Sequence, residues 1–169
     1  KAAFNITKSS SLLELVIFEN GTVGNGIQSN NPWLQEMSDP ITKACWDNYL
    51  TVSPKQVEEW DIELGDMTTQ MVNLTVNGQS LKLPVLPQPG QKYGTVGLAI
   101  GYGRSVAGKV GNQVGFNAYP LINVNEGGQL DFNIYTNVTV EPTDEVYAIA
   151  QTQTHHTFMR RGNVIQEAI

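Results

Sequence analysis

The clearest chemical signal in this sequence is a glycine-rich stretch between residues 97 and 119, GLAIGYGRSVAGKVGNQVGFNAY. Within it, Gly103 to Lys109 matches the spacing of a phosphate-binding loop, in which backbone N–H groups and a lysine surround the phosphates of a nucleotide. Such a loop also needs a Ser or Thr after the lysine to hold Mg²⁺, and Val110 stands there instead. Gly111 and Gly115 disfavour the helix that would have to follow. A nucleotide hydrolase is therefore the weakest interpretation of the stretch.

Two other interpretations of this loop are open. Gly101, Tyr102, Gly103 and Arg104 could cradle the phosphates of a dinucleotide, because glycine allows close backbone approach and a planar guanidinium grips phosphate through two hydrogen bonds. Alternatively, the glycines fit a tightly wound structural loop in which Arg104 pairs with a carboxylate or with backbone carbonyl groups. We favour the structural interpretation, because function resides in sites rather than in folds.

The aromatic and imidazole side chains offer further candidates. His155 and His156 could supply a metal ligand or a proton acceptor, since imidazole titrates near neutral pH. Adjacent residues of a strand point to opposite faces, so both cannot readily bind one metal, and we expect one histidine to contact a neighbouring domain. Trp33 and Trp46 could stack on a purine or pterin ring, although packing inside the core is the commoner use of tryptophan.

The sequence gives little support for a metal site or for a catalytic nucleophile. Asp61, Glu63 and Asp66 surround an apparent turn, but their spacing does not match a calcium loop, so we interpret them as a solvated acidic corner. Cys45 is the only cysteine, and it can neither form an internal disulfide nor ligate an iron–sulfur cluster alone. We therefore expect no catalytic residue and no metal ligand in this chain.

The composition limits the partners and the fold class. A net charge of −6 with few arginines disfavours DNA and RNA, whose binding proteins present clustered Lys and Arg. Only 15% of the residues are charged, against about 25% in a typical domain, and Gly and Pro are plentiful, which favours β structure rich in turns. With 169 residues the chain predicts one domain. It does not begin with Met, and we expect it to be a piece of a longer polypeptide.

Short apolar runs and turn signals predict the elements. Strands are expected near residues 12–18, 45–52, 67–76, 79–85, 96–100, 130–140 and 145–153, with weak helical periodicity after them. Ser53-Pro54-Lys55-Gln56 predicts a helix start that ends near Trp60, and Asn77-Gly78 predicts a hairpin. The loop from Gly24 to Pro40 is expected to pack Trp33, Leu34 and Met37 against the sheet. Many short strands with one or two short helices predict a mainly β domain that is a closed barrel or sandwich.

A family resemblance sharpens this prediction. The order of strand, short helix SPKQVEEW and then Gly65-Asp66 opening a strand and hairpin resembles the GD box of double-psi β-barrels, as in the C-terminal dinucleotide-binding domain of the molybdopterin oxidoreductase family. The motifs NNPWLQEMSDP, WDNYLTVSPK, GYGRSVAGKVGNQVGFNAY and QTQTHH together look like the molybdopterin-oxidoreductase-like iron–sulfur subunit of bacterial alternative complex III, a quinol-oxidising respiratory complex. The resemblance runs from about Leu12 to the end of the sequence.

The resemblance implies a double-psi β-barrel-like domain that acts as a non-catalytic scaffold of an exported electron-transfer subunit. Its partners would be other domains of the same chain and neighbouring subunits of a membrane-bound complex at the periplasmic face, without insertion into the membrane itself. Iron–sulfur clusters would lie elsewhere in the parent chain. The alternative is a genuine domain for molybdopterin guanine dinucleotide, held by the residues of the motifs above: Asn31, Trp33, Gly101, Tyr102, Gly103, Arg104 and His155.

Overall fold

The computed structural model describes residues 13–134 and 136–153. The strands are β1 (Glu14–Phe18), β2 (Leu50–Val52), β3 (Leu64–Gly65), β4 (Thr68–Val76), β5 (Gln79–Pro87), β6 (Thr95–Ala99), β7 (Asn123–Val124), β8 (Leu130–Asp131), β9 (Asn133–Ile134) and β10 (Val138–Ala148). The helices are α1 (Pro32–Glu36), α2 (Pro54–Glu59) and α3 (Gly108–Gly111), with a 3-10 turn at Tyr119–Leu121. The mainly β class is confirmed, with three short α-helices where one or two were expected.

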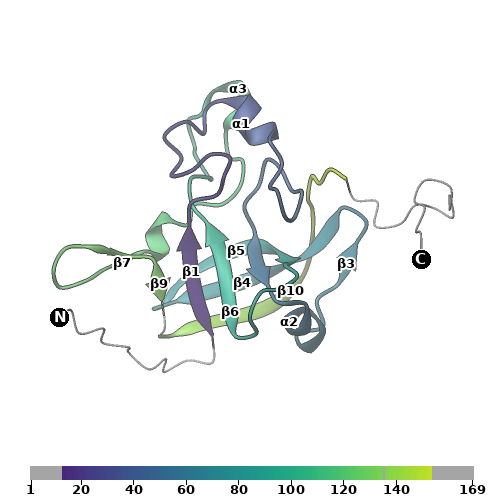
Figure 1. Ribbon diagram of the computed structural model, residues 1–169, viewed down its shortest axis with the longest axis vertical. Helices are drawn as coiled ribbons and strands as arrows, with labels where there is room; N and C mark the ends of the chain where they lie inside the picture. Colours follow the sequence, from purple (N-terminus) through teal and green to yellow (C-terminus); the bar gives the residue numbers. More distant parts are fainter. Residues whose placement is uncertain (1–12, 135, 154–169) are drawn as a thin grey trace, which may run out of the picture.

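Eight strands form one mixed sheet in the order β10-β4-β5-β2-β6-β1-β9, and β3 pairs with β4. The pairs β1–β6 and β2–β5 are parallel, and the remaining pairs are antiparallel. Within the described ranges β9 and β10 do not pair, so the hydrogen-bonded sheet is open, and β9 and β10 are its two edge strands. The two-stranded β7–β8 hairpin extends to one side (Figure 1).

The core lies where these strands face one another. Buried residues alternate along β1 and along most of β4, as period-2 side-chain placement predicts, whereas consecutive residues are buried in the second half of β5 and in β6. The residues expected on one face of β6, Val96, Leu98 and Ile100, all belong to the main core, while Ala99 packs in a separate cluster. The buried members from these four strands, with Ile100 just beyond β6, are Leu15, Ile17, Val72, Leu74, Val76, Leu83, Val85, Val96, Leu98 and Ile100.

Local signals placed α2 and the β4–β5 hairpin correctly. The Ser53 side chain accepts a hydrogen bond from the Gln56 amide while Gln56 reaches back to the Ser53 backbone, so both halves of the capping box are formed. The helix is followed by Trp60 as its C-cap, as expected. Asn77 and Gly78 both have positive φ, as a type I′ turn requires.

Two expected strands differ from the structure. The stretch from Cys45 is not a strand until Leu50, because Trp46 adopts a positive φ that a strand cannot contain. Residues 138–148 form one long strand, although two strands were predicted across residues 130–153. Its register shifts between Pro142 and Val146, and its place at the end of the sheet accommodates a proline that lacks an N–H group.

Above the ends of β1 and β6 lies a region that we call the loop lobe, residues 20–39 and 101–117, which carries α1 and α3 (Figure 1). It contains the glycine-rich loop and the loop that follows β1. None of the helices in the described part of the chain is long and apolar enough to cross a membrane.

Candidate functional site

The glycine-rich loop leaves β6 and borders a pocket of about 350 Å³ in the loop lobe. Four of the residues predicted from the sequence gather there, and the loop that follows β1 supplies the opposite wall. The lining residues are Asn25, Gly26, Gly101, Tyr102, Gly103, Arg104, Ser105, Val106, Asn117 and Tyr119. The pocket is therefore the place where the structure can test the two interpretations of the loop.

The glycines at the start of the loop line the pocket, but a side chain on either of them would point into protein backbone. Gly101 has a φ of +97°, and a Cβ built on it would lie 2.8 Å from the carbonyl oxygen of Gly24. Gly103 has a φ of +76°, and a Cβ there would lie 2.3 Å from the amide nitrogen of Asn117. Real Cβ atoms do not approach other atoms so closely, so both positions require glycine for internal packing.

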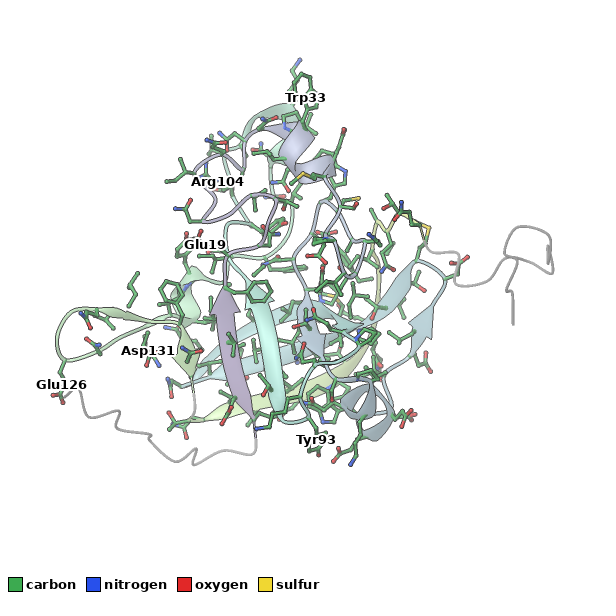
Figure 2. The ribbon with its side chains drawn as sticks, in the orientation of Figure 1. Glu19, Trp33, Tyr93, Arg104, Glu126 and Asp131 are labelled. Carbon is green, nitrogen blue, oxygen red and sulfur yellow. The ribbon has the colours of Figure 1, made fainter. Side chains whose placement is uncertain are left out.

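Arg104 joins the two walls of the loop lobe. Its Nη1 donates to the Asn30 side-chain oxygen at 2.9 Å, and its Nη2 donates to the Gly26 carbonyl oxygen. The expected pairing with a backbone carbonyl is confirmed, whereas the second acceptor is an amide oxygen in place of a carboxylate. Figure 2 shows Arg104 inside the lobe, between the loop after β1 and the glycine-rich loop. Two N–H groups of the guanidinium are therefore engaged within the chain.

Tyr102 is buried and links two loops. Only 6% of its surface is exposed. Its hydroxyl group accepts a hydrogen bond from Asn20 Nδ2 at 2.6 Å and lies 3.2 Å from the Thr22 hydroxyl. Burial raises the pKa of this phenol above its ordinary value, and the two hydrogen bonds partly offset the effect. Tyr102 thus anchors the loop after β1 to the glycine-rich loop.

Amide groups farther along the glycine-rich loop are also paired within the chain. The Gly103 amide donates to the Val114 carbonyl at 2.8 Å, and the Gln113 amide donates to the Arg104 carbonyl at 2.7 Å. The Ala107 amide donates to the Asn112 side chain. These bonds close the loop on itself, which is the wound conformation that the structural interpretation predicts.

The nucleotide-hydrolase interpretation finds no support in the geometry. The helix after the glycine-rich loop, α3, has four residues, and its N-cap Ala107 makes no side-chain capping bond. Val110 is half exposed and offers no hydroxyl group for Mg²⁺. A phosphate-binding loop relies on a longer helix whose first N–H groups point at the phosphates.

Asn31 and Trp33 do not line the pocket. Asn31 caps α1 by accepting a hydrogen bond from the Trp33 amide at 3.1 Å. The prediction that Trp33 and Met37 are buried is wrong, because their exposed fractions are 79% and 46%. Leu34 alone of the three packs inward, against Val23 and its neighbours. Figure 2 shows Trp33 at the outer end of the loop lobe.

His155 and His156 lie outside the described residues, so the structure does not test them. Among the residues that it does describe, no group of three His, Cys, Asp or Glu side chains could hold a metal ion. The acidic corner of Asp61, Glu63 and Asp66 is exposed.

Sequence reasoning missed the two residues that fix the base of the loop. Asn48 is 1% exposed; its Nδ2 donates to the carbonyl oxygens of Ala99 and Phe116, and its Oδ1 accepts from the Phe116 amide at 2.7 Å. Asp47 Oδ1 accepts from the Gly115 amide at 3.2 Å and from the Tyr147 hydroxyl at 2.9 Å. The available signal was a polar Asp-Asn pair directly before an apolar run.

The environment of Asp47 disfavours its charged form. Burial raises the pKa of this carboxyl group above its ordinary value, while the hydrogen bonds from Tyr147 and Gly115 act in the opposite direction. Asp47 in turn helps raise the pKa of the Tyr147 phenol, for which burial is the largest cause. The pair ties β10 to the glycine-rich loop and supplies no nucleophile or free base to the pocket.

Comparisons with known proteins give limited information. No protein-family model matches the chain, and no curated protein sequence matches it. Among solved structures, acetylene hydratase from Pelobacter acetylenicus is similar, with 15% sequence identity and a TM-score of 0.45 over 76% of this chain. The chain spans 18% of the length of that protein. The family resemblance of the sequence therefore stays a hypothesis.

Proposed function

We propose that this chain is a non-catalytic scaffold domain of a larger electron-transfer subunit of the molybdopterin-oxidoreductase type. One observation carries the proposal: the groups of the glycine-rich loop that could hold a dinucleotide are engaged by the chain itself. Arg104 bridges Asn30 and the Gly26 carbonyl, and the spaces beside Gly101 and Gly103 are filled by backbone. In a phosphate cradle, the space beside such glycines admits the ligand.

The residues therefore fit a pyrophosphate group poorly. For Arg104 to bind one with the same two nitrogens, its bonds to the buried Gly26 carbonyl group and to the exposed Asn30 side chain would have to break, and the link between the two segments of the loop lobe would be lost. The Gly26 carbonyl group would keep its hydrogen bonds from the Ser29 amide and hydroxyl groups, so the cost is that of losing a hydrogen bond to a charged group, about 1.5–3 kcal/mol. No catalytic step through a pterin group is assigned to this chain.

A scaffold needs a surface for its partners, and the loop lobe offers one. Several large apolar side chains on it are exposed, and we propose that they form part of a protein contact. They are Ile27, Trp33, Met37, Val106 and Val110. The motif order in the sequence supports other domains of the same polypeptide, and subunits of a respiratory complex at the periplasmic face of the bacterial inner membrane, as the partners. Iron–sulfur clusters would be bound elsewhere in the parent chain.

A genuine molybdopterin-guanine-dinucleotide domain is the second candidate function. The pocket of about 350 Å³ favours it, because the pocket lies directly beside the predicted residues Gly101 to Arg104. Ligand pockets of a few hundred Å³ are typical of cofactor sites.

Metal and pterin analysis of the intact parent protein, purified within its active complex, separates the two functions. The scaffold proposal predicts that molybdenum, tungsten and pterin are each far below one per chain while iron is abundant. Stoichiometric molybdenum or tungsten together with pterin would contradict the scaffold proposal and support the second candidate.

A further inference from the structure

The sequence contains three Asn-Gly pairs, which begin at Asn20, Asn25 and Asn77. Asparagine before glycine can lose its side-chain nitrogen as ammonia without an enzyme, because glycine carries no side chain that would shield its amide nitrogen. That nitrogen attacks the side-chain carbonyl carbon, Cγ, of the asparagine. The attack needs a glycine amide that is free of hydrogen bonds and an asparagine side chain that can turn. The fold therefore decides which of the three pairs reacts.

At the first pair, the asparagine side chain is held in place. Asn20 Oδ1 accepts from the backbone amides of Thr22 and Val23, at 3.3 and 3.1 Å. Asn20 Nδ2 donates to the Tyr102 hydroxyl group at 2.6 Å. Cγ can turn toward the Gly21 nitrogen only after these three bonds break, so this pair is protected.

At the second pair, the glycine is held instead. Gly26 is buried, and its amide donates to the Val23 carbonyl at 2.9 Å. A Cβ on Gly26 would lie 2.6 Å from the Cα atom of Gly101, so the backbone has no room to shift. Asn25 Oδ1 also accepts from the Ile27 amide at 3.1 Å. The nitrogen that would attack is thus engaged and confined, and this pair is protected as well.

The third pair lacks both restraints. Asn77 and Gly78 are exposed at the tip of the β4–β5 hairpin, and the Gly78 amide makes no hydrogen bond with the described part of the chain. Two hydrogen bonds hold the Asn77 side chain: Nδ2 donates to Asn123 Oδ1 at 3.3 Å, and Oδ1 accepts from Asn137 Nδ2 at 3.2 Å. Both lengths lie at or beyond the upper end of the ordinary range, so these bonds are weak.

We propose that Asn77 is a site of spontaneous deamidation in the folded chain. The Gly78 nitrogen gives its proton to the solvent and bonds to Cγ of Asn77, while the Cγ–Nδ2 bond breaks and Nδ2 leaves as ammonia. The product is a succinimide ring, which water opens at one of its two carbonyl groups to give aspartate or isoaspartate. Apart from the adjoining residues, no atom lies within 4 Å of the place of a Gly78 Cβ, so the ring has space.

The modification loosens a junction between three segments. Asn77 joins the β4–β5 turn to Asn123 at the start of β7 and to Asn137 before β10. A carboxylate has no N–H group to offer the Asn123 oxygen. Isoaspartate also adds a carbon atom to the backbone of a two-residue turn that depends on positive φ at both positions. The inference does not depend on the scaffold function, since Asn77 lies outside the loop lobe.

Peptide mass spectrometry of the folded chain, after incubation at mildly alkaline pH, tests the site. Asn77 is expected to deamidate at least about tenfold faster than Asn20 or Asn25, the factor that the opening of two ordinary hydrogen bonds accounts for. In the chain unfolded by guanidinium chloride, the three pairs should react at similar rates. A folded chain in which Asn77 reacts no faster than Asn20 or Asn25 would overturn the proposal.

Two variants test whether the junction controls the rate. Asn123→Ala combined with Asn137→Ala removes both bonds that hold the Asn77 side chain, so Asn77 should deamidate several times faster than in the wild type. Asn133→Ala is the matched control, because Asn133 is exposed and makes no hydrogen bond to Asn77. An Asn77 rate that is equal in the double variant and in the control would contradict the proposal, since the measured site would then not be governed by the observed contacts.

Discussion

At the scale of single residues, the structure shows why the glycine-rich loop needs its glycines. Gly103 combines a positive φ with a backbone neighbour at the place of its missing side chain. Gly108 also has a positive φ, of +80°, but nothing lies within 4 Å of its missing Cβ. The two positions therefore separate the effect of backbone conformation from the effect of close packing.

Gly103→Ala is expected to destabilise the chain by about 2–4 kcal/mol, because left-handed backbone strain of about 1–2 kcal/mol adds to the overpacking of a filled space. Gly108→Ala should cost only the strain. Urea unfolding of both variants measures the difference. Equal losses would show that the contact between Gly103 and Asn117 does not constrain the loop.

Asp47 makes the stability of the chain dependent on pH. Its pKa in the native state is raised by burial, so protonation favours folding, and this contribution to stability is lost as the pH rises through the native pKa. Asn at this position cannot ionise, yet its side-chain oxygen can still accept from Gly115 and Tyr147. The free energy of unfolding of the wild type relative to Asp47→Asn should therefore fall between acidic and neutral pH.

Urea unfolding of both proteins across this pH range gives that difference directly. Asp47→Ala serves as the control, since it removes both acceptor contacts and should be less stable than Asp47→Asn at every pH. A difference between wild type and Asp47→Asn that is independent of pH, or that rises with pH, would refute the assignment.

At the scale of elements, sequence patterns predicted what local physics determines. Alternation placed Val96, Leu98 and Ile100 on the covered face of the sheet, and the capping box placed the start of α2. Both signals act within a few residues of the chain. Local patterns did not predict the length of β10. A strand can contain Pro142 at the edge of a sheet, and this position depends on the order of all the strands.

The loops were harder to predict because their contacts are distant in sequence. Arg104 bonds to Gly26, 78 residues earlier, and Asn48 bonds to Phe116, 68 residues later. No local pattern encodes such pairs. Trp33 illustrates the opposite error: a large apolar side chain in a loop predicted burial, yet α1 holds it outward, 79% exposed. The residues of the glycine-rich loop and the type of acceptor for Arg104 were found from the sequence, whereas Asp47, Asn48 and the distant segments that they join were not.

At the scale of the whole molecule, a mixed sheet supports a lobe of loops that is stabilised mainly by polar contacts. Tyr102, Arg104, Asp47 and Asn48 each join segments that are far apart in the sequence. Among these contacts, those of Arg104 engage two N–H groups that a phosphate could otherwise use. The lobe thus presents an ordered outer surface with exposed apolar side chains, which suits a domain that holds other parts of an assembly in place.

The most direct test of this account is the unfolding midpoint of the 169-residue chain with and without guanosine diphosphate or Mg²⁺-ATP. A ligand at 100 times its Kd would stabilise the native state by about 2.7 kcal/mol. We predict that neither nucleotide moves the midpoint, and that Arg104→Lys lowers it equally in their presence and absence, because an ammonium group cannot replace the fork that bridges Gly26 and Asn30. A clear rise with a nucleotide that Arg104→Lys abolishes would contradict the account and make the glycine-rich loop a working phosphate site.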